Sequence, residues 1–170
     1  IRSYFLQNVK GPKPSQTSYG NDLSWQCSTT NLTLINPAGC VKTCNGQLVN
    51  VDGITPDDMR RGASCTSNPT FTPYAWETMQ GMVMAARVLE RAGMPIWNEA
   101  DSAICRAASV LQDARFGAEW KADSDDRWQL AFLDRACNKN WSKGTDPDGK
   151  PYGNTIWGAG KNAGWPYVIY

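Results

Sequence analysis

The chain contains no histidine among its 170 residues. That absence excludes Ser-His-Asp and Cys-His catalysis, and it leaves any zinc site to cysteine alone. No run of about 18 apolar residues occurs, so we expect no membrane-spanning segment. The formal net charge is only +1, which gives no indication of a nucleic-acid-binding surface.

Metal and phosphate motifs are also lacking. The acidic runs at 123–126 and 146–149 do not have the spaced ligands of a calcium loop, and they are more typical of a helix cap and a turn. The glycine-rich stretch at 158–164 lacks the residue order of a phosphate-binding loop. We therefore expect neither a metal nor a cofactor.

The six cysteines favour disulfides over a metal site, because no Cys-x-x-Cys pair is present. An even number of cysteines without metal-ligand spacing is typical of an oxidising compartment, so we predict a secreted protein with every cysteine oxidised. The sequence alone does not choose among the possible pairings. We expect four cysteines of the first part to pair among themselves, and the two in predicted helices to pair with each other: Cys27, Cys40, Cys44 and Cys65, then Cys105 and Cys137.

Two Asn-x-Ser/Thr sequons agree with secretion, at Asn31 and at Asn140. A third triplet, at Asn68, is excluded by its proline. In a eukaryotic secretory pathway we expect Asn31 and Asn140 to be glycosylated.

The chain is predicted to form one structural domain of mainly α class, because strand signals are poor. Residues 1–53 look like a helix end followed by a cysteine-rich loop region. Residues 54–142 carry the helix signals and are expected to form helical hairpins. Residues 143–170 are rich in glycine and aromatics, and we expect an irregular tail there.

Helix starts are marked twice by a Thr-Pro pair. Thr55 and Pro56 precede two aspartates that suit the positive end of a helix dipole, which predicts a short helix. Thr72 and Pro73 begin a longer pattern that ends at Gly93. Its apolar residues recur at steps of three and four, so one face should be buried: Ala75, Met79, Met82, Ala86 and Leu89.

Two further helices are predicted from the same periodicity. The inward positions of the third are Ala100, Ile104, Ala107 and Leu111. Those of the fourth, which should begin near the acidic run at 123–126, are Trp128, Phe132 and Ala136.

The predicted helices are too few to form a closed ring. We therefore expect an apolar flank that a second polypeptide segment, or a second copy of the chain, would cover.

Arginine and tyrosine are the residues whose chemistry stands out once histidine is excluded. A uronate polymer can be cleaved by β-elimination, which needs a neutralised carboxylate, a base for the C5 proton and an acid for the leaving oxygen. Arginine can neutralise a carboxylate by a bidentate fork. A tyrosine can act as base or acid when cations lower its pKa from about 10. A structural alternative stays open, in which Arg61 pairs with Asp57 or Asp58 and Tyr74 is buried.

Four stretches, in order, resemble the second half of the alginate-lyase-like polysaccharide lyases: "DGITPDDMRRG", "FTPYAWETMQGMVMAARVLERAGMPIWNEADSAICRA", "DSDDRW" and "GAGKNAGWPY". The resemblance covers roughly residues 52–170. It implies part of an (α/α) toroid with a groove for an acidic polysaccharide, and lyase activity. Carried over by residue, it implies Arg61 as carboxylate neutraliser and Tyr74 as catalytic tyrosine, with the substrate-binding residues Arg60, Trp76, Glu77 and Gln80.

The chain departs from that family in two ways. The first half, which supplies further residues near the substrate carboxylate, is absent. The histidine that relatives often carry between the arginine and the tyrosine is absent as well. The sequence is therefore compatible with a lyase completed by another segment, or with a non-catalytic carbohydrate-binding or scaffold subunit of the same fold.

Overall fold

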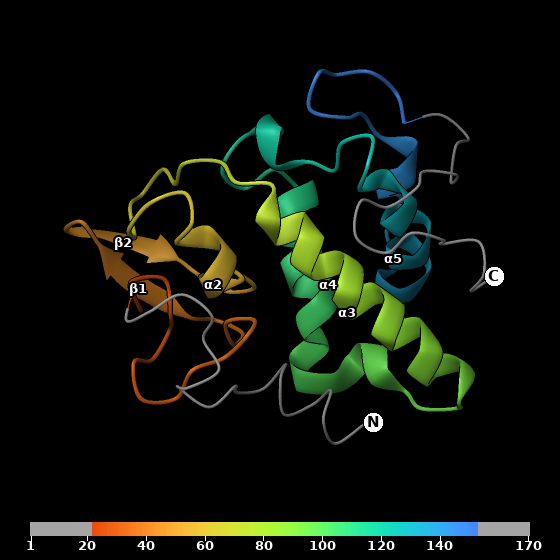
Figure 1. Cartoon of the computed structure of the whole chain (residues 1–170), viewed down its shortest axis with the longest axis horizontal. Helices are drawn as coiled ribbons and strands as arrows, with labels where there is room; N and C mark the ends of the chain where they lie inside the picture. Colours follow the sequence, from red (N-terminus) through yellow and green to blue (C-terminus); the bar gives the residue numbers. More distant parts are fainter. Residues whose placement is uncertain (1–21, 153–170) are drawn as a thin grey trace.

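The computed structural model describes residues 22–152. The predicted helix end at 1–10, the glycine-rich stretch at 158–164 and most of the expected tail lie outside the described residues. Within them the chain is mainly helical, as predicted. Figure 1 shows three principal helices grouped together, with a small hairpin and a short helix to one side. The principal helices are α3 (Tyr74–Arg91), α4 (Glu99–Gln112) and α5 (Leu130–Cys137).

Helix α3 forms where its periodicity predicts. All five positions of its expected apolar face are buried, which confirms that part of the prediction: Ala75, Met79, Met82, Ala86 and Leu89. The helix begins at Tyr74 with Pro73 as its N-cap, one residue later than the Thr-Pro signal predicts. The backbone N–H of Tyr74 donates to the hydroxyl of Thr72 at 3.4 Å, so the threonine still serves the helix start.

Helix α4 packs against α3, and α5 packs against α4. Each of the two is introduced by a 3₁₀ turn, at Ile96–Asn98 and at Arg127–Gln129. Most of their predicted inward positions are buried: Ile104, Ala107, Leu111, Trp128 and Phe132. The outermost two, Ala100 and Ala136, are only half-buried. Two more 3₁₀ turns, Ala118–Trp120 and Trp141–Lys143, lie in the loops around α5.

A two-stranded hairpin occupies part of the region for which we expected loops alone. Strands β1 (Val41–Cys44) and β2 (Gln47–Asn50) pair antiparallel, with Val41 opposite Asn50. Asn45 and Gly46 form the two-residue turn, and both have positive φ, at 47° and 79°. An Asn-Gly pair between short strands is the preferred hairpin turn, because both residues tolerate that backbone conformation.

Three disulfides join the elements, and all six cysteines are used, as predicted. The four cysteines of the first part pair among themselves, Cys27 with Cys40 and Cys44 with Cys65. Cys105 pairs with Cys137 and links α4 to α5. The first disulfide thus joins the loop around Cys27 to the residue before β1, and the second joins the end of β1 to the loop that precedes α3.

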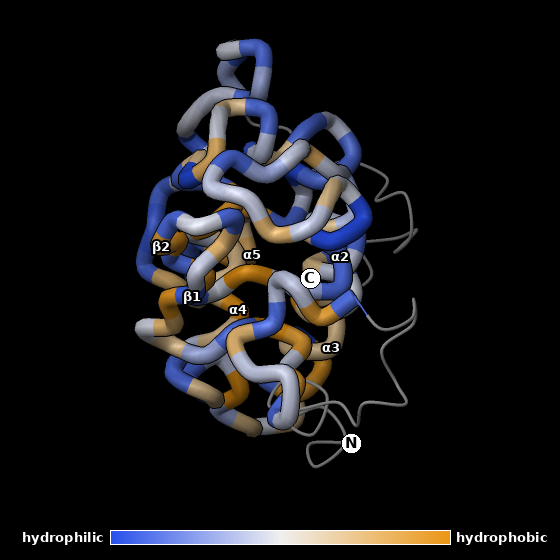
Figure 2. Tube along the Cα trace, turned by 90° about the vertical axis from the view of Figure 1, so that its left-hand side faces the viewer, coloured by the Kyte–Doolittle hydropathy of each residue, from blue (hydrophilic) through white to orange (hydrophobic). Residues whose placement is uncertain are grey.

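The core lies among the helices and is rich in tryptophan. Figure 2 shows hydrophobic positions concentrated along α3 and α4, while the outer loops are mostly hydrophilic. Four tryptophans are among the most deeply buried side chains: Trp25, Trp76, Trp120 and Trp128. Burial of such large rings supplies much of the apolar area that stabilises a domain of this size.

In the described part of the chain, no helix has both the length and the apolar character that crossing a membrane demands.

Candidate functional site

Arg61 and Tyr74 meet at the surface between α2 (Pro56–Met59) and α3. The guanidinium carbon of Arg61 lies 4.3 Å from the centroid of the Tyr74 ring, in a cation–π arrangement. Tyr74 is 39% exposed, and Arg61 is exposed as well. The two residue types that the sequence analysis singled out therefore lie together and face solvent. We call this pair the Arg61–Tyr74 face.

The chain between Arg61 and Tyr74 packs closely against itself at Gly62 and is tied to the hairpin at Cys65. The structure leaves almost no room beside Gly62, where an added Cβ would lie 2.3 Å from the carbonyl oxygen of Thr70. Midway, Cys65 is tied to the hairpin by its disulfide with Cys44. These two restraints fold the loop back on itself and bring Arg61 to the first turn of α3.

Behind the face lies Asp58, which is 4% exposed. Its Oδ1 accepts a hydrogen bond from the Thr78 hydroxyl of α3 at 3.0 Å, while its buried Oδ2 has no hydrogen-bond partner. Burial raises the pKa of Asp58 to about 7, and the Thr78 hydroxyl opposes that rise. The nearby Asp57 charge raises this pKa further, whereas a hydrogen bond from the Thr55 side chain and, after it, the Arg61 charge lower it.

Arg60 points to a different partner. Its Nε donates to Oδ1 of Asp57 at 2.8 Å, and its Nη2 lies 2.7 Å from the same oxygen. Asp57, one of the two partners that the structural alternative offered to Arg61, thus forms an ion pair with Arg60. Of the two neighbouring arginines, Arg61 is the one whose guanidinium reaches the Tyr74 ring.

The other predicted binding residues of α3 do not all reach the surface. Trp76 is 2% exposed and donates from its indole nitrogen to the carbonyl oxygen of Trp120 at 2.8 Å. Gln80 is 1% exposed and donates to Oδ1 of Asp126 at 2.9 Å. Glu77 is half-buried. Trp76 and Gln80 thus hold α3 in place from behind, and they lie away from the solvent that Tyr74 faces.

Glu77 and Gln80 line a small crevice together with Pro73 and three aspartates, Asp123, Asp125 and Asp126. Burial raises the pKa of Asp126 to about 7, which the hydrogen bond from Gln80 opposes and the neighbouring carboxylates reinforce. Between residues 22 and 152, no group of three or more histidine, cysteine or acidic residues is arranged to hold a metal ion.

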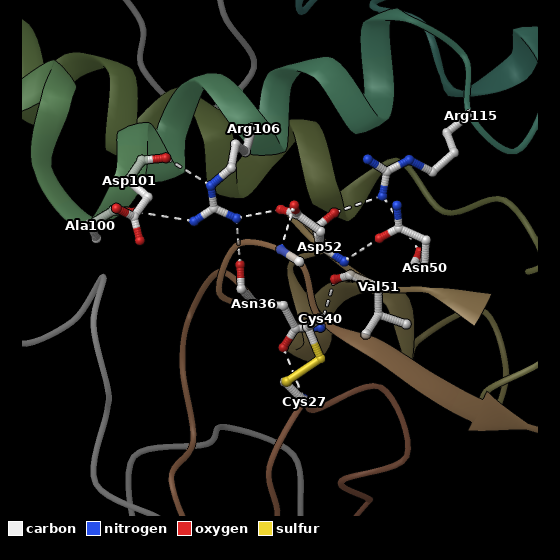
Figure 3. A network of polar contacts seen from close by, with 11 residues as sticks. Cys27, Asn36, Cys40, Asn50, Val51, Asp52, Ala100, Asp101, Arg106 and Arg115 are labelled. Atoms are coloured by element: carbon white, nitrogen blue, oxygen red, sulfur yellow. Dashed lines mark hydrogen bonds and ion pairs between the residues drawn. A yellow bond between two sulfur atoms is a disulfide. The ribbon is translucent and has the colours of Figure 1, made fainter. Parts of the chain in front are cut away.

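A second cluster of arginines has a structural role. Arg106 of α4 donates to the carbonyl oxygens of Asn36, Ala100 and Asp101 and pairs with Asp52, as Figure 3 shows. Ala100, Asp101 and Ser102 all have φ between 51° and 54°, a left-handed turn that is costly for residues other than glycine. The guanidinium of Arg106 holds two carbonyls of that turn and ties it to the loop before the hairpin.

Arg115 completes this clamp by donating to the carbonyl oxygen of Asp52 at 2.6 Å. Burial lowers the pKa of Arg115, and the Asp52 charge opposes that shift. Two cavities adjoin the clamp, one of about 450 Å³ beside Arg106 and one of about 160 Å³ between Arg106, Arg115 and Lys139. The donors of Arg106 are directed to backbone carbonyls and to Asp52 rather than into either space.

The predicted glycosylation sites are accessible, since Asn31 and Asn140 are both exposed.

Asp58 and Thr78 are the residues near the Arg61–Tyr74 face that sequence reasoning missed. The two aspartates of "PDDM" suit a helix N-terminus equally well, and nothing in the sequence indicates that the second is buried against α3.

Comparison with protein-family models, with curated proteins and with solved structures finds no match to this chain.

Proposed function

We propose that this chain binds a uronate-containing polysaccharide at the Arg61–Tyr74 face and, in a complete enzyme, contributes to its cleavage by β-elimination. The observation that carries the proposal is the contact of the Arg61 guanidinium with the Tyr74 ring, 4.3 Å from its centroid, at an exposed position. One sugar unit could meet both groups there, its carboxylate at the guanidinium and its C5 at the phenol.

The chemistry assigns one role to each residue. Arg61 would neutralise the carboxylate, which makes the C5 proton acidic. The ionised Tyr74 oxygen would take that proton, and the electron pair of the C5–H bond would form the C4–C5 double bond as the C4–O bond breaks. The leaving oxygen would then receive a proton from the tyrosine. No other reactant is needed, because elimination consumes no water.

The proposed fold is the second half of an (α/α) toroid, with a further polypeptide segment completing the groove. This part rests on the resemblance of four ordered stretches of sequence and on the mainly helical structure of α3, α4 and α5. Apolar side chains exposed at Val41, Leu48 and Val88 offer contacts for such a segment. Three disulfides agree with a secreted protein.

The alternative is a carbohydrate-binding subunit without catalysis. The absence of histidine favours this alternative, because the proposed elimination then depends on Tyr74 for both of its proton transfers. In that case Arg61 and Tyr74 would hold a uronate unit by charge and by contact with the ring face. The two functions share the binding site and differ in whether product forms.

Calorimetric titration with uronate oligosaccharides and with neutral ones of equal length tests the proposal. We expect the uronate ligands alone to bind, and Arg61→Gln to abolish binding. Arg91→Gln, an exposed arginine at the far end of the same helix, is the matched control and should bind like the wild type. Equal binding of neutral ligands, or undiminished binding by Arg61→Gln, would contradict the proposal. Appearance of the absorbance of an unsaturated uronate product separates lyase from binding protein.

A further inference from the structure

Phe71 is a large apolar side chain that stays exposed just ahead of α3. It is 41% exposed, and it precedes Tyr74, which is 39% exposed, by three residues. Three residues of chain span at most about 11 Å, so the Cα atoms of the two aromatic residues lie within the length of a short oligosaccharide. A single exposed apolar side chain is ordinary, and the surroundings of Phe71 are what set it apart.

The ring of Phe71 is held from behind by a core side chain. It meets the ring of Trp120 edge to face, with the centroids 5.3 Å apart and an interplanar angle of 81°. Trp120 is completely buried, and its carbonyl oxygen accepts the hydrogen bond from the Trp76 indole. The exposed ring is thus fixed relative to the helix that carries Tyr74.

The residues on either side of Phe71 are held as well. The carbonyl oxygen of Thr70 lies against Gly62, where an added Cβ would approach it to 2.3 Å. Thr72 is 3% exposed, and its hydroxyl accepts a hydrogen bond from the backbone N–H of Tyr74 at 3.4 Å. Because the segment is already fixed on both sides of the ring, a ligand that packs on Phe71 has little chain to order.

The hydrophobic core does not use this ring. Phe116 also meets Trp120 edge to face, with the centroids 6.1 Å apart, but it is half-buried and packs against the core. Among the described residues, Phe71 lies outside that core. Of these two phenylalanines on Trp120, Phe71 is the one that presents its ring to solvent near Tyr74.

We propose that Phe71 forms a second sugar-binding position, where its ring packs against the sugar unit next to the one at Arg61 and Tyr74. A pyranose ring carries C–H bonds on its faces, and such a face makes a close apolar contact with an aromatic ring. Residues 62–76 include no charged side chain, so this loop recognises the sugar ring rather than its carboxylate. The inference rests on the proposed function, because it extends the Arg61–Tyr74 face to a neighbouring unit of the same polysaccharide.

The second position makes affinity depend on ligand length. A uronate monosaccharide at the Arg61–Tyr74 face does not reach Phe71, whereas a longer oligosaccharide contacts both positions. Loss of the Phe71 ring should therefore weaken the long ligands selectively. A merely structural role of Phe71, in which its loss displaced Tyr74, would weaken ligands of every length alike.

Phe71→Leu and Phe116→Leu are matched variants, since each removes one ring from Trp120 and keeps an aliphatic side chain in its place. Each is titrated with uronate ligands of one to four sugar units, followed by NMR. We expect Phe71→Leu to weaken binding of the longer ligands about three- to tenfold and to leave the monosaccharide unchanged. Phe116→Leu should match the wild type at every length, and Phe71→Trp should keep the affinity for long ligands. No loss in Phe71→Leu, or an equal loss at every length, overturns the inference.

The contact itself can be observed by NMR in protein that is deuterated except at its phenylalanine rings. Magnetisation passes from a ring to the C–H groups of a bound sugar only over a short distance. We expect transfer to a uronate tetrasaccharide in the wild type and in Phe116→Leu, and its loss in Phe71→Leu. A wild type that binds the tetrasaccharide without transfer overturns this inference and leaves the proposed function standing. Failure of the wild type to bind any uronate ligand overturns both.

Discussion

The indole nitrogen of Trp76 donates a hydrogen bond to the backbone carbonyl oxygen of Trp120, 2.8 Å away and 44 residues along the chain. Both side chains are buried, at 2% and 0% exposure. The bond attaches the first turn of α3, which begins at Tyr74, to the 3₁₀ turn Ala118–Trp120. A core contact thus holds the first turn of α3, which carries Tyr74.

Trp76→Phe tests that core contact. The substitution leaves the Trp120 carbonyl without its donor and opens space in the core, so we expect the free energy of unfolding to fall by about 2–4 kcal/mol. Urea unfolding followed by circular dichroism measures the change. Val88→Ala, at a half-exposed position of the same helix, should change it by less than about 0.5 kcal/mol. Equal effects of the two substitutions would show that Trp76 is not a core contact.

Gly53→Ala and Gly46→Ala separate backbone strain from steric overlap. Both glycines have positive φ, at 74° and 79°, so an alanine is strained at either site. A Cβ at Gly53 would lie 2.7 Å from the carbonyl oxygen of Arg106, whereas nothing lies within 4 Å at Gly46. We expect Gly46→Ala to cost about 1 kcal/mol and Gly53→Ala to cost roughly 1–3 kcal/mol more. Thermal unfolding of the two variants side by side provides the comparison, and equal melting temperatures would count against the close approach.

The buried Asp126 makes stability depend on pH. Its pKa of about 7 in the folded protein exceeds the ordinary value of 3.8, so the folded state keeps a proton that the unfolded chain loses. The contribution of Asp126 to the free energy of unfolding therefore falls as the pH rises from 3.8 to about 7, and it is level above that range.

Asp126→Asn should remove this contribution while preserving an acceptor for Gln80. Relative to the wild type, the variant should become progressively more stable between pH 4 and pH 7. Urea unfolding at a series of pH values measures the difference, and Asp148→Asn, at an exposed position, should follow the wild type throughout. A constant difference between Asp126→Asn and the wild type would contradict the assignment.

Tyr74→Phe and Arg61→Lys distinguish chemistry from binding at the proposed site. In a complete enzyme, Tyr74→Phe should abolish elimination and retain binding, because the ring remains and the hydroxyl is lost. Arg61→Lys should lose the bidentate fork and most of the rate. Product absorbance and calorimetric affinity give the two readouts. Full activity of Tyr74→Phe would exclude the tyrosine as the proton carrier.

Helix α3 could be predicted from sequence because its signals are local. The Thr72-Pro73 start, the apolar steps from Ala75 to Leu89 and the Gly93 stop all act within one helix, and tertiary packing agrees with them. The hairpin was missed because its strands have only four residues each, although its Asn45-Gly46 turn is a signal that could have indicated it.

The candidate site could be predicted only in part. The sequence indicated Arg61 and Tyr74, and the structure places their side chains in contact. The buried, structural roles of Trp76 and Gln80 could not be predicted from the sequence. Whether a helical side chain is buried depends on which other segments pack against it. Their partners, Trp120 and Asp126, lie 44 and 46 residues away along the chain.

The sequence by itself determined the helical class, the buried face of α3 and the oxidation of all six cysteines. Each of these follows from composition or from spacing within one segment, and the structure confirms them. Tertiary structure decided which of the two neighbouring arginines reaches Tyr74, and it alone placed Asp58 in the interior. The physical reason is that solvation and charge depend on distances between segments, and those distances exist only once the chain has folded.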